Sequence, residues 1–126
     1  MAGERVLIVE DNERNMKLFR DVLEARGYVT LEASSGAQAV ELALAHMPDI
    51  VLMDIRLPDI DGIEALRRLR AEERTASIPV LAVTAQAMRG DRERFLAAGF
   101  DGYVAKPVDI AELAAAVGEH CEGPSR

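Results

Sequence analysis

Near the middle of the chain stands the stretch Val51-Leu52-Met53-Asp54-Ile55-Arg56-Leu57-Pro58-Asp59-Ile60-Asp61-Gly62, which decides the fold. Together with Ile50, its first three residues make a continuous apolar run, which is what a strand buried on both faces requires. The run ends at one carboxylate, Asp54, and the turn formers Pro58 and Gly62 follow. Because a buried carboxylate is costly to desolvate, we expect another group in the chain to pair with Asp54.

The composition is that of one globular domain. The chain has 126 residues, of which 49% are hydrophobic, enough for a single core. We expect residues 1–121 to form the domain and 122–126 a C-terminal tail. The net charge of −7 argues against a nucleic-acid-binding surface, which would need a basic stripe. The single cysteine indicates a reducing compartment.

Membrane and export signals are missing from the sequence. No apolar run approaches the roughly 20 residues of a membrane span. The apolar residues 6–9 are too few for a signal peptide and are followed by acids. We therefore expect a cytoplasmic protein with neither membrane nor nucleic acid among its partners.

Apolar segments and helical patterns alternate along the chain. The expected strands are residues 5–9, 28–31, 50–54, 78–83 and 102–105. The expected helices are residues 13 to about 26, from Ser35 to before Pro48, from Asp61 through Leu69, about 89–98, and 109 to about 120. Parallel strands joined by right-handed helical crossovers make a three-layer α/β sandwich, which is the predicted fold class.

The residues that follow four of the expected strands are all polar. They are Glu10-Asp11, Asp54, Thr84 and Lys106. In open α/β sheets, sites lie outside the carboxyl ends of the strands, so these side chains are expected to converge. Three carboxylates repel one another unless a divalent cation such as Mg²⁺ lies among them. With a carboxylate nucleophile, a lysine and a hydroxyl, such a site is suited to phosphoryl transfer.

These strand-end residues, in this order and on this scaffold, resemble the receiver domain of bacterial two-component response regulators. The segments Val6–Asn12, Asn15–Phe19 and Thr84–Met88 resemble those of small single-domain members of that family. The resemblance covers residues 5 to 120. It implies a flavodoxin-like, doubly wound (βα)5 fold with a five-stranded parallel sheet of order 2-1-3-4-5.

The resemblance also implies a role for each site residue. Asp54 is the phosphoacceptor. Glu10 and Asp11 help it to hold Mg²⁺, or Mn²⁺ in its place, and the backbone carbonyl of Arg56 completes the metal shell. Thr84 binds the phosphoryl oxygens.

Four further features follow from the same resemblance. Lys106 also binds the phosphoryl oxygens, and the peptide bond from Lys106 to Pro107 is cis. Tyr103 is the switch aromatic, which turns inward as Thr84 moves toward the phosphoryl group. Arg56 and Gln86 occupy positions that tune the lifetime of the phosphoryl group.

The implied partners are proteins. The phosphoryl donor is a sensor histidine kinase, a histidine phosphotransfer protein, or both in turn. A downstream protein target is expected at the face made by the fourth helix, fifth strand and fifth helix. The chain is expected to be a signalling phosphoacceptor that acts only on its own phosphorylation, and not an enzyme with a separate substrate. The sequence leaves open the oligomeric state and whether the chain is part of a longer protein.

Four other classes of protein deserve comparison. An FMN carrier needs a glycine- and hydroxyl-rich phosphate cradle after the first strand, and a dinucleotide oxidoreductase needs Gly-x-Gly-x-x-Gly there, whereas this chain has acids. A phosphatase of the haloacid dehalogenase type needs a second aspartate two residues after the nucleophile, where this chain has Arg56. The remaining alternative is a degenerate receiver that serves as a phosphorylation-independent binding scaffold, against which the complete set of site residues argues.

Overall fold

The sheet has the predicted strand order. The structure is a computed structural model that describes residues 3–85 and 91–122. Its strands are β1 (Arg5–Val9), β2 (Val29–Ala33), β3 (Ile50–Asp54), β4 (Val80–Thr84) and β5 (Gly102–Ala105). They form one parallel sheet of order β2-β1-β3-β4-β5. The α/β fold class and the order 2-1-3-4-5 are therefore confirmed.

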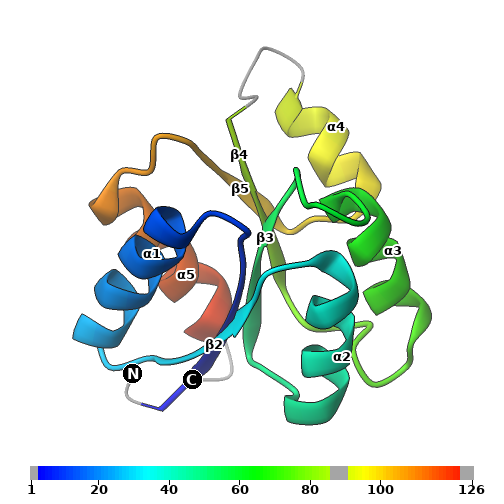
Figure 1. Cartoon of the computed structure of the whole chain (residues 1–126), viewed down its shortest axis with the longest axis horizontal. Coiled ribbons are helices and arrows are strands. Elements are labelled where there is room, and N and C mark those ends of the chain that lie inside the picture. Colours follow the sequence, from blue (N-terminus) through cyan, green and yellow to red (C-terminus); the bar gives the residue numbers. More distant parts are fainter. Residues whose placement is uncertain (1–2, 86–90, 123–126) are drawn as a thin grey trace.

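Helices cover both faces of the sheet. They are α1 (Glu13–Ala25), α2 (Gly36–His46), α3 (Gly62–Ala71), α4 (Asp91–Ala98) and α5 (Ile110–Glu122). Helices α1 and α5 lie on one face, and α2, α3 and α4 lie on the other (Figure 1). Each face has its own apolar core, with Phe19 fully buried in one and Phe95 in the other. No helix in residues 3–85 and 91–122 is long and apolar enough to cross a membrane.

Two of the strands have boundaries that differ from the prediction. We predicted the second strand at residues 28–31, but β2 begins at Val29 and continues to Ala33. The amide of Tyr28 donates to the carbonyl of Leu23 and so belongs to the end of α1, while Ala33 still accepts a hydrogen bond from Glu10 N. Strand β4 begins at Val80, two residues later than predicted, because the amide of Ile78 closes a turn onto Thr75.

Helix starts follow the capping residues. Ser35 accepts from Gln38 N, Asp61 from Glu64 N and Asp109 from Glu112 N, which confirms the three predicted caps. The fourth helix was predicted at about 89–98. The structure has α4 from Asp91 to Ala98, and residues 89 and 90 lie outside the described part of the chain. Helix α5 extends to Glu122, into the segment predicted as a tail.

Arg70 ties α3 to the amino ends of two strands. Its guanidinium donates to three backbone carbonyl groups, those of Ala76, Ile78 and Gly99, and to the carboxylate of Asp101. Asp101 in turn accepts from Val80 N, at the start of β4. One side chain therefore fastens together the α3–β4 and α4–β5 connections, at the sheet edge opposite Asp54.

We expect Arg70→Ala to lower the free energy of unfolding by about 1–3 kcal/mol, because two partly buried carbonyl groups, those of Ala76 and Ile78, and two exposed acceptors lose a charged donor together. The matched control is Arg68→Ala, whose guanidinium pairs with Glu64 on the exposed face of the same helix. That change is expected to cost less than about 0.5 kcal/mol. Urea unfolding followed by circular dichroism measures both. Equal losses in the two variants would contradict the role given to Arg70.

Candidate functional site

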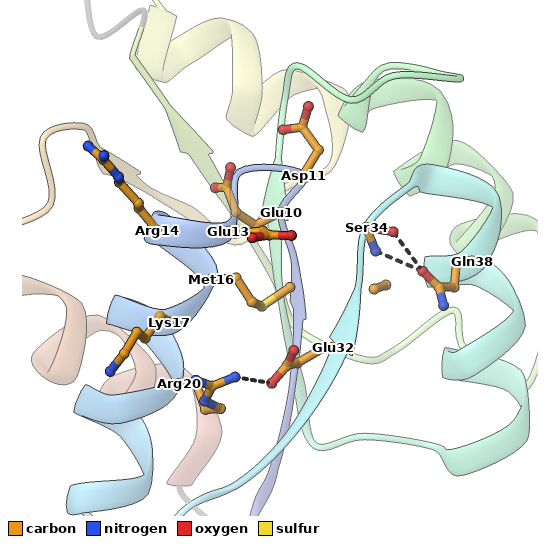
Figure 2. A pocket seen from close by; sticks show the side chains of 11 residues that line it. Glu10, Asp11, Glu13, Arg14, Met16, Lys17, Arg20, Glu32, Ser34 and Gln38 are labelled. Atoms are coloured by element: carbon orange, nitrogen blue, oxygen red, sulfur yellow. Dashed lines mark hydrogen bonds and ion pairs between the residues drawn. The ribbon is translucent and has the colours of Figure 1, made fainter.

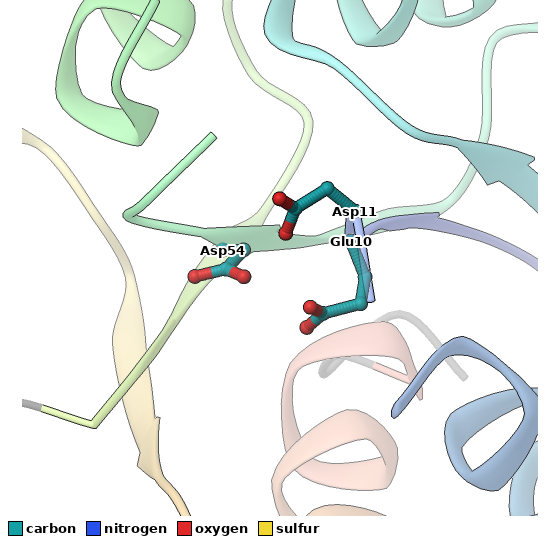
Figure 3. A group of neighbouring side chains, drawn as sticks. All are labelled: Glu10, Asp11 and Asp54. Carbon is teal, nitrogen blue, oxygen red and sulfur yellow. The ribbon is translucent and has the colours of Figure 1, made fainter. Parts of the chain in front are cut away.

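Three carboxylates lie together at the carboxyl edge of the sheet. Glu10 and Asp11 directly follow β1, and Asp54 is the last residue of the neighbouring strand β3. One oxygen from each lies within 4.8 Å of the others (Figure 3). Glu10 and Asp54 are only 2% and 5% exposed, whereas Asp11 is open to solvent. The convergence that the strand-end rule predicts is present.

Lys106 supplies the positive charge of the site. Its ammonium nitrogen lies 3.1 Å from Glu10 Oε1 and 3.1 Å from Asp54 Oδ2. Its backbone amide donates to the carbonyl of Thr84 at 2.8 Å, which holds the start of the β5–α5 loop against the end of β4. The following peptide bond, to Pro107, is cis. The partner that Asp54 needs for its burial is therefore Lys106, 52 residues further along the chain.

Backbone amides orient the two buried carboxylates. Arg56 N donates to Asp54 Oδ1 at 3.1 Å, and Asn12 N donates to Glu10 Oε2 at 3.2 Å. Glu10 Oε1 is buried in an ion pair with Lys106 but accepts no hydrogen bond of good geometry among the described residues. Each carboxylate thus has one oxygen held by the backbone and one facing the lysine.

Burial and like charge set the electrostatics of this cluster. Burial and the negative charge of Asp54 raise the pKa of Glu10, against the opposing effect of Lys106. Burial alone would lower the pKa of Lys106, but its contacts with Glu10 and Asp54 outweigh burial, so the pKa of Lys106 is raised. The lysine is therefore charged at neutral pH. The cluster has more negative than positive charge and attracts a further cation.

Thr84 and Tyr103 lie on the adjacent strands β4 and β5. Thr84 ends β4 and is 2% exposed. Tyr103 lies on β5 and pairs in register with Ala82 of β4. Its half-buried ring is 6.4 Å from the ring of Phe95 on α4. The ring of Tyr103 is therefore close to the part of α4 that contains Phe95. Gln86, which the resemblance assigns to phosphoryl lifetime, lies outside the described residues.

The loop after Asp54 contains a position that only glycine can occupy. A Cβ at Gly62 would lie 2.5 Å from the carbonyl oxygen of Asp54 and 2.9 Å from Ile55 Cα. The amide of Gly62 also donates to the carbonyl of Ile55 at 2.8 Å. Pro58 and Gly62 marked this turn in the sequence, but they did not show that α3 begins directly against the backbone of Asp54.

An open pocket of about 680 Å³ lies beside the acidic edge, between α1, β2 and the start of α2 (Figure 2). Asp11 and Glu13 line it at one end, and the ion pair of Arg20 with Glu32, 2.9 Å long, lies at the other. Glu10 borders both the pocket and the cluster with Asp54. The acidic site is therefore open to solvent on the α1 side.

The donor set suits a hard divalent cation. Mg²⁺ prefers oxygen ligands, usually one or two carboxylates together with carbonyl oxygens, waters and phosphate oxygens. Glu10, Asp11 and Asp54 offer carboxylate oxygens at suitable separations, and Glu10 Oε1 lacks a well-aligned hydrogen bond. The residues present therefore fit Mg²⁺. Their excess negative charge is the physical reason for its attraction.

Comparison with known proteins agrees with this geometry. The sequence pattern of the response regulator receiver domain matches residues 6–118. The polar-differentiation response regulator DivK of Brucella ovis is 51% identical over 105 residues, which are 83% of this chain and 85% of that protein. The match therefore spans more than four fifths of both proteins.

Solved structures show the same fold. The receiver domain of a sensor histidine kinase from Pseudomonas aeruginosa PAO1, with a magnesium ion coordinated in its active-site cleft, superposes with a TM-score of 0.89 at 40% identity, covering 97% of this chain and all of that one. A putative response regulator from Chloroflexus aurantiacus gives a TM-score of 0.91 at 30% identity and covers 96% of this chain and 99% of that one. This chain belongs to the response regulator receiver domain family, the signalling phosphoacceptors of two-component systems.

Proposed function

We propose that this receiver takes a phosphoryl group from a phosphohistidine onto Asp54 and thereby switches its protein–protein contacts. One observation carries the proposal. Asp54 is a buried carboxylate at the open edge of the sheet, between the Lys106 ammonium and the Arg56 amide, with Glu10 and Asp11 beside it. Its relatives with 40% and 51% identity are a magnesium-containing receiver and DivK.

The transfer is a displacement at phosphorus. A carboxylate oxygen of Asp54 forms the new P–O bond as the P–N bond to the donor histidine breaks, and the electron pair of that bond returns to the imidazole nitrogen. Glu10, Asp11, Asp54 and the carbonyl of Arg56 would hold Mg²⁺. When bound, Mg²⁺ neutralises charge between the carboxylates and the incoming phosphoryl oxygens.

Lys106 and the hydroxyl of Thr84 then bind the phosphoryl group on Asp54. Lys106 lies 3.1 Å from Asp54 Oδ2 and needs only a small shift to pair with a phosphoryl oxygen. Thr84, at the adjacent strand end, donates its hydroxyl to another. The acyl phosphate adds a charge of about −1.5 to −2, so both contacts exist only in the phosphorylated state. A ligand shifts an equilibrium only through such differences between states.

The output is proposed to be read at the face of α4, β5 and α5. As Thr84 moves, Tyr103 turns inward against Phe95, 6.4 Å away in this structure. Tyr103 also lines a pocket of about 440 Å³ on that face, together with Leu96 of α4 and Ala116 of α5. Rotation of its ring therefore changes the shape that a downstream protein meets.

We place the exchange in the cytoplasm, with a sensor histidine kinase or histidine phosphotransfer protein as the donor. Residues 1–121 would act as one receiver unit, with 122–126 as its tail. Membership of the receiver family supports a kinase partner. Magnesium is the expected metal, with manganese in its place where that ion is supplied.

Intact mass tests the proposal. Wild-type protein incubated with Mg²⁺ and a small acyl-phosphate donor should gain the mass of one phosphoryl group, and a metal chelator should abolish the gain. The same incubation with a cognate kinase supplied with ATP should give the same product. If neither donor adds mass in the presence of Mg²⁺, the chain is a phosphorylation-independent scaffold and the proposal is wrong.

A further inference from the structure

The loop that carries the candidate metal ligand of Arg56 is attached to α2 through Asp59. Its carboxylate accepts hydrogen bonds from the first two amides of that helix, Gly36 N at 2.8 Å and Ala37 N at 2.9 Å. These backbone bonds lower the pKa of Asp59 to about 2. Asp59 comes five residues after Asp54, so the loop that follows the acidic site caps a helix from a different part of the chain.

Helix α2 and the β3–α3 loop also pack closely next to these hydrogen bonds. A Cβ at Gly36 would lie 2.4 Å from Cγ1 and 2.9 Å from Cδ1 of Ile60, the residue after Asp59. A Cβ at this position would force the side chain of Ile60 to move, so α2 and the loop are in close contact here. The hydrogen bonds of Asp59 and the packing of Ile60 therefore fix the loop against α2.

The other end of the same loop is held at Asp54 and α3. Gly62 lies against the Asp54 carbonyl, and Asp61 caps α3 by accepting from Glu64 N at 2.8 Å. Arg56 lies between these attachments, with its amide on Asp54 Oδ1. If the α2 attachment is lost, the backbone of Arg56 is still held through Asp54, through the bond of Ile55 N to the Val83 carbonyl and through the start of α3, but no longer through α2.

We propose that Asp59 is a positioning residue for the metal site and that it couples the start of α2 to metal occupancy. By holding the β3–α3 loop on Gly36 and Ala37, it keeps the Arg56 backbone facing the acidic cluster. This inference rests on the proposed function of that cluster as a magnesium-dependent phosphoacceptor site. Because coupling between two sites is reciprocal, a metal held by the loop must also alter the amides that Asp59 binds.

The test is a Mg²⁺ titration followed by amide ¹H–¹⁵N NMR, with no phosphoryl donor present. In wild type, the amides of Gly36 and Ala37 should shift with the same midpoint as that of Asp11. In Asp59→Ala, their response should vanish, and the midpoint at Asp11 should rise about tenfold, the low end of what outer-shell partners contribute to metal affinity. Asp59→Asn, which keeps one acceptor oxygen, should restore part of both effects.

Ser35→Ala is the matched control. Ser35 caps the same end of α2 by accepting from Gln38 N, but the described contacts of its side chain do not include the β3–α3 loop. Its loss should lower stability without changing the Mg²⁺ midpoint. The proposal is overturned if Asp59→Ala and Asp59→Asn bind Mg²⁺ within twofold of wild type, if Ser35→Ala weakens binding equally, or if Gly36 and Ala37 do not respond in wild type. Failure of the proposed function would look different, because wild type would then bind Mg²⁺ yet gain no phosphoryl group.

Discussion

Asp54→Asn is expected to gain no phosphoryl mass under conditions in which wild type is fully converted. An amide oxygen is a poor nucleophile and cannot form the acyl phosphate, so the loss should be complete. The variant should still fold, since Lys106 keeps its ion pair with Glu10 and one of three crowded carboxylates is removed. Intact mass measures the phosphoryl gain, and circular dichroism checks the fold.

The control for this prediction is Asp61→Asn in the same loop. Asp61 is exposed and caps α3, and asparagine caps helices as well as aspartate does, so phosphorylation should persist. The mass of Asp54→Asn also tests which of the neighbouring carboxylates, Glu10, Asp11 or Asp54, accepts the phosphoryl group. Glu10 is still more buried than Asp54 and its second oxygen is held by Asn12 N, while Asp11 is exposed. A phosphoryl gain in Asp54→Asn would move the acceptor to one of them.

Lys106→Met is expected to slow phosphoryl uptake by about 10²- to 10³-fold at saturating Mg²⁺. Removal of one preorganised donor from a site of charge transfer typically has an effect of this size. Methionine keeps an unbranched chain but has no charge for Asp54 Oδ2 or for the incoming phosphoryl oxygens. It also leaves Glu10 without the cation that opposes the rise of its pKa. A time course of intact mass at neutral pH gives the rate.

Lys17→Met is the matched control, because it removes a lysine that has no expected role in phosphoryl transfer. Lys17 is exposed on α1 and pairs with Asp21 four residues later, at 2.6 Å. Its replacement should leave the rate within about twofold, because an exposed pair of this kind contributes little. A rate for Lys106→Met close to that of Lys17→Met would mean that the lysine serves the fold and not the transfer.

The order in which strands and helices alternate could be predicted from the sequence, because each of these elements depends on a local pattern of residues. The apolar run of β3 is typical of a strand buried on both faces, and the caps at Ser35, Asp61 and Asp109 mark helix starts by local hydrogen bonds. The predicted ends of a strand were less accurate where a residue outside that strand competed for its backbone hydrogen bonds. The amide of Tyr28 bonds to Leu23 instead of joining β2, and no pattern in residues 28–31 reveals this.

The sequence also predicted which residues come together in the site, because parallel strands all end at one edge of the sheet. That rule places Asp54 beside Glu10 and Lys106 without any knowledge of distance. It does not say which carboxylate oxygen faces the lysine, or that Glu10 is more buried than Asp54. Those facts depend on side-chain packing and on the backbone amides of Asn12 and Arg56.

Local periodicity and charge were enough to predict the α/β class, the strand-end cluster and its need for a cation. Folding, and no local pattern, brings Arg70 to the α3–β4 and α4–β5 connections and Asp59 to the amides of Gly36 and Ala37. Both are polar side chains that bond to backbone groups far along the chain. Such hydrogen bonds depend on where folding places those backbone groups in space, and the periodicity of the sequence does not predict their positions.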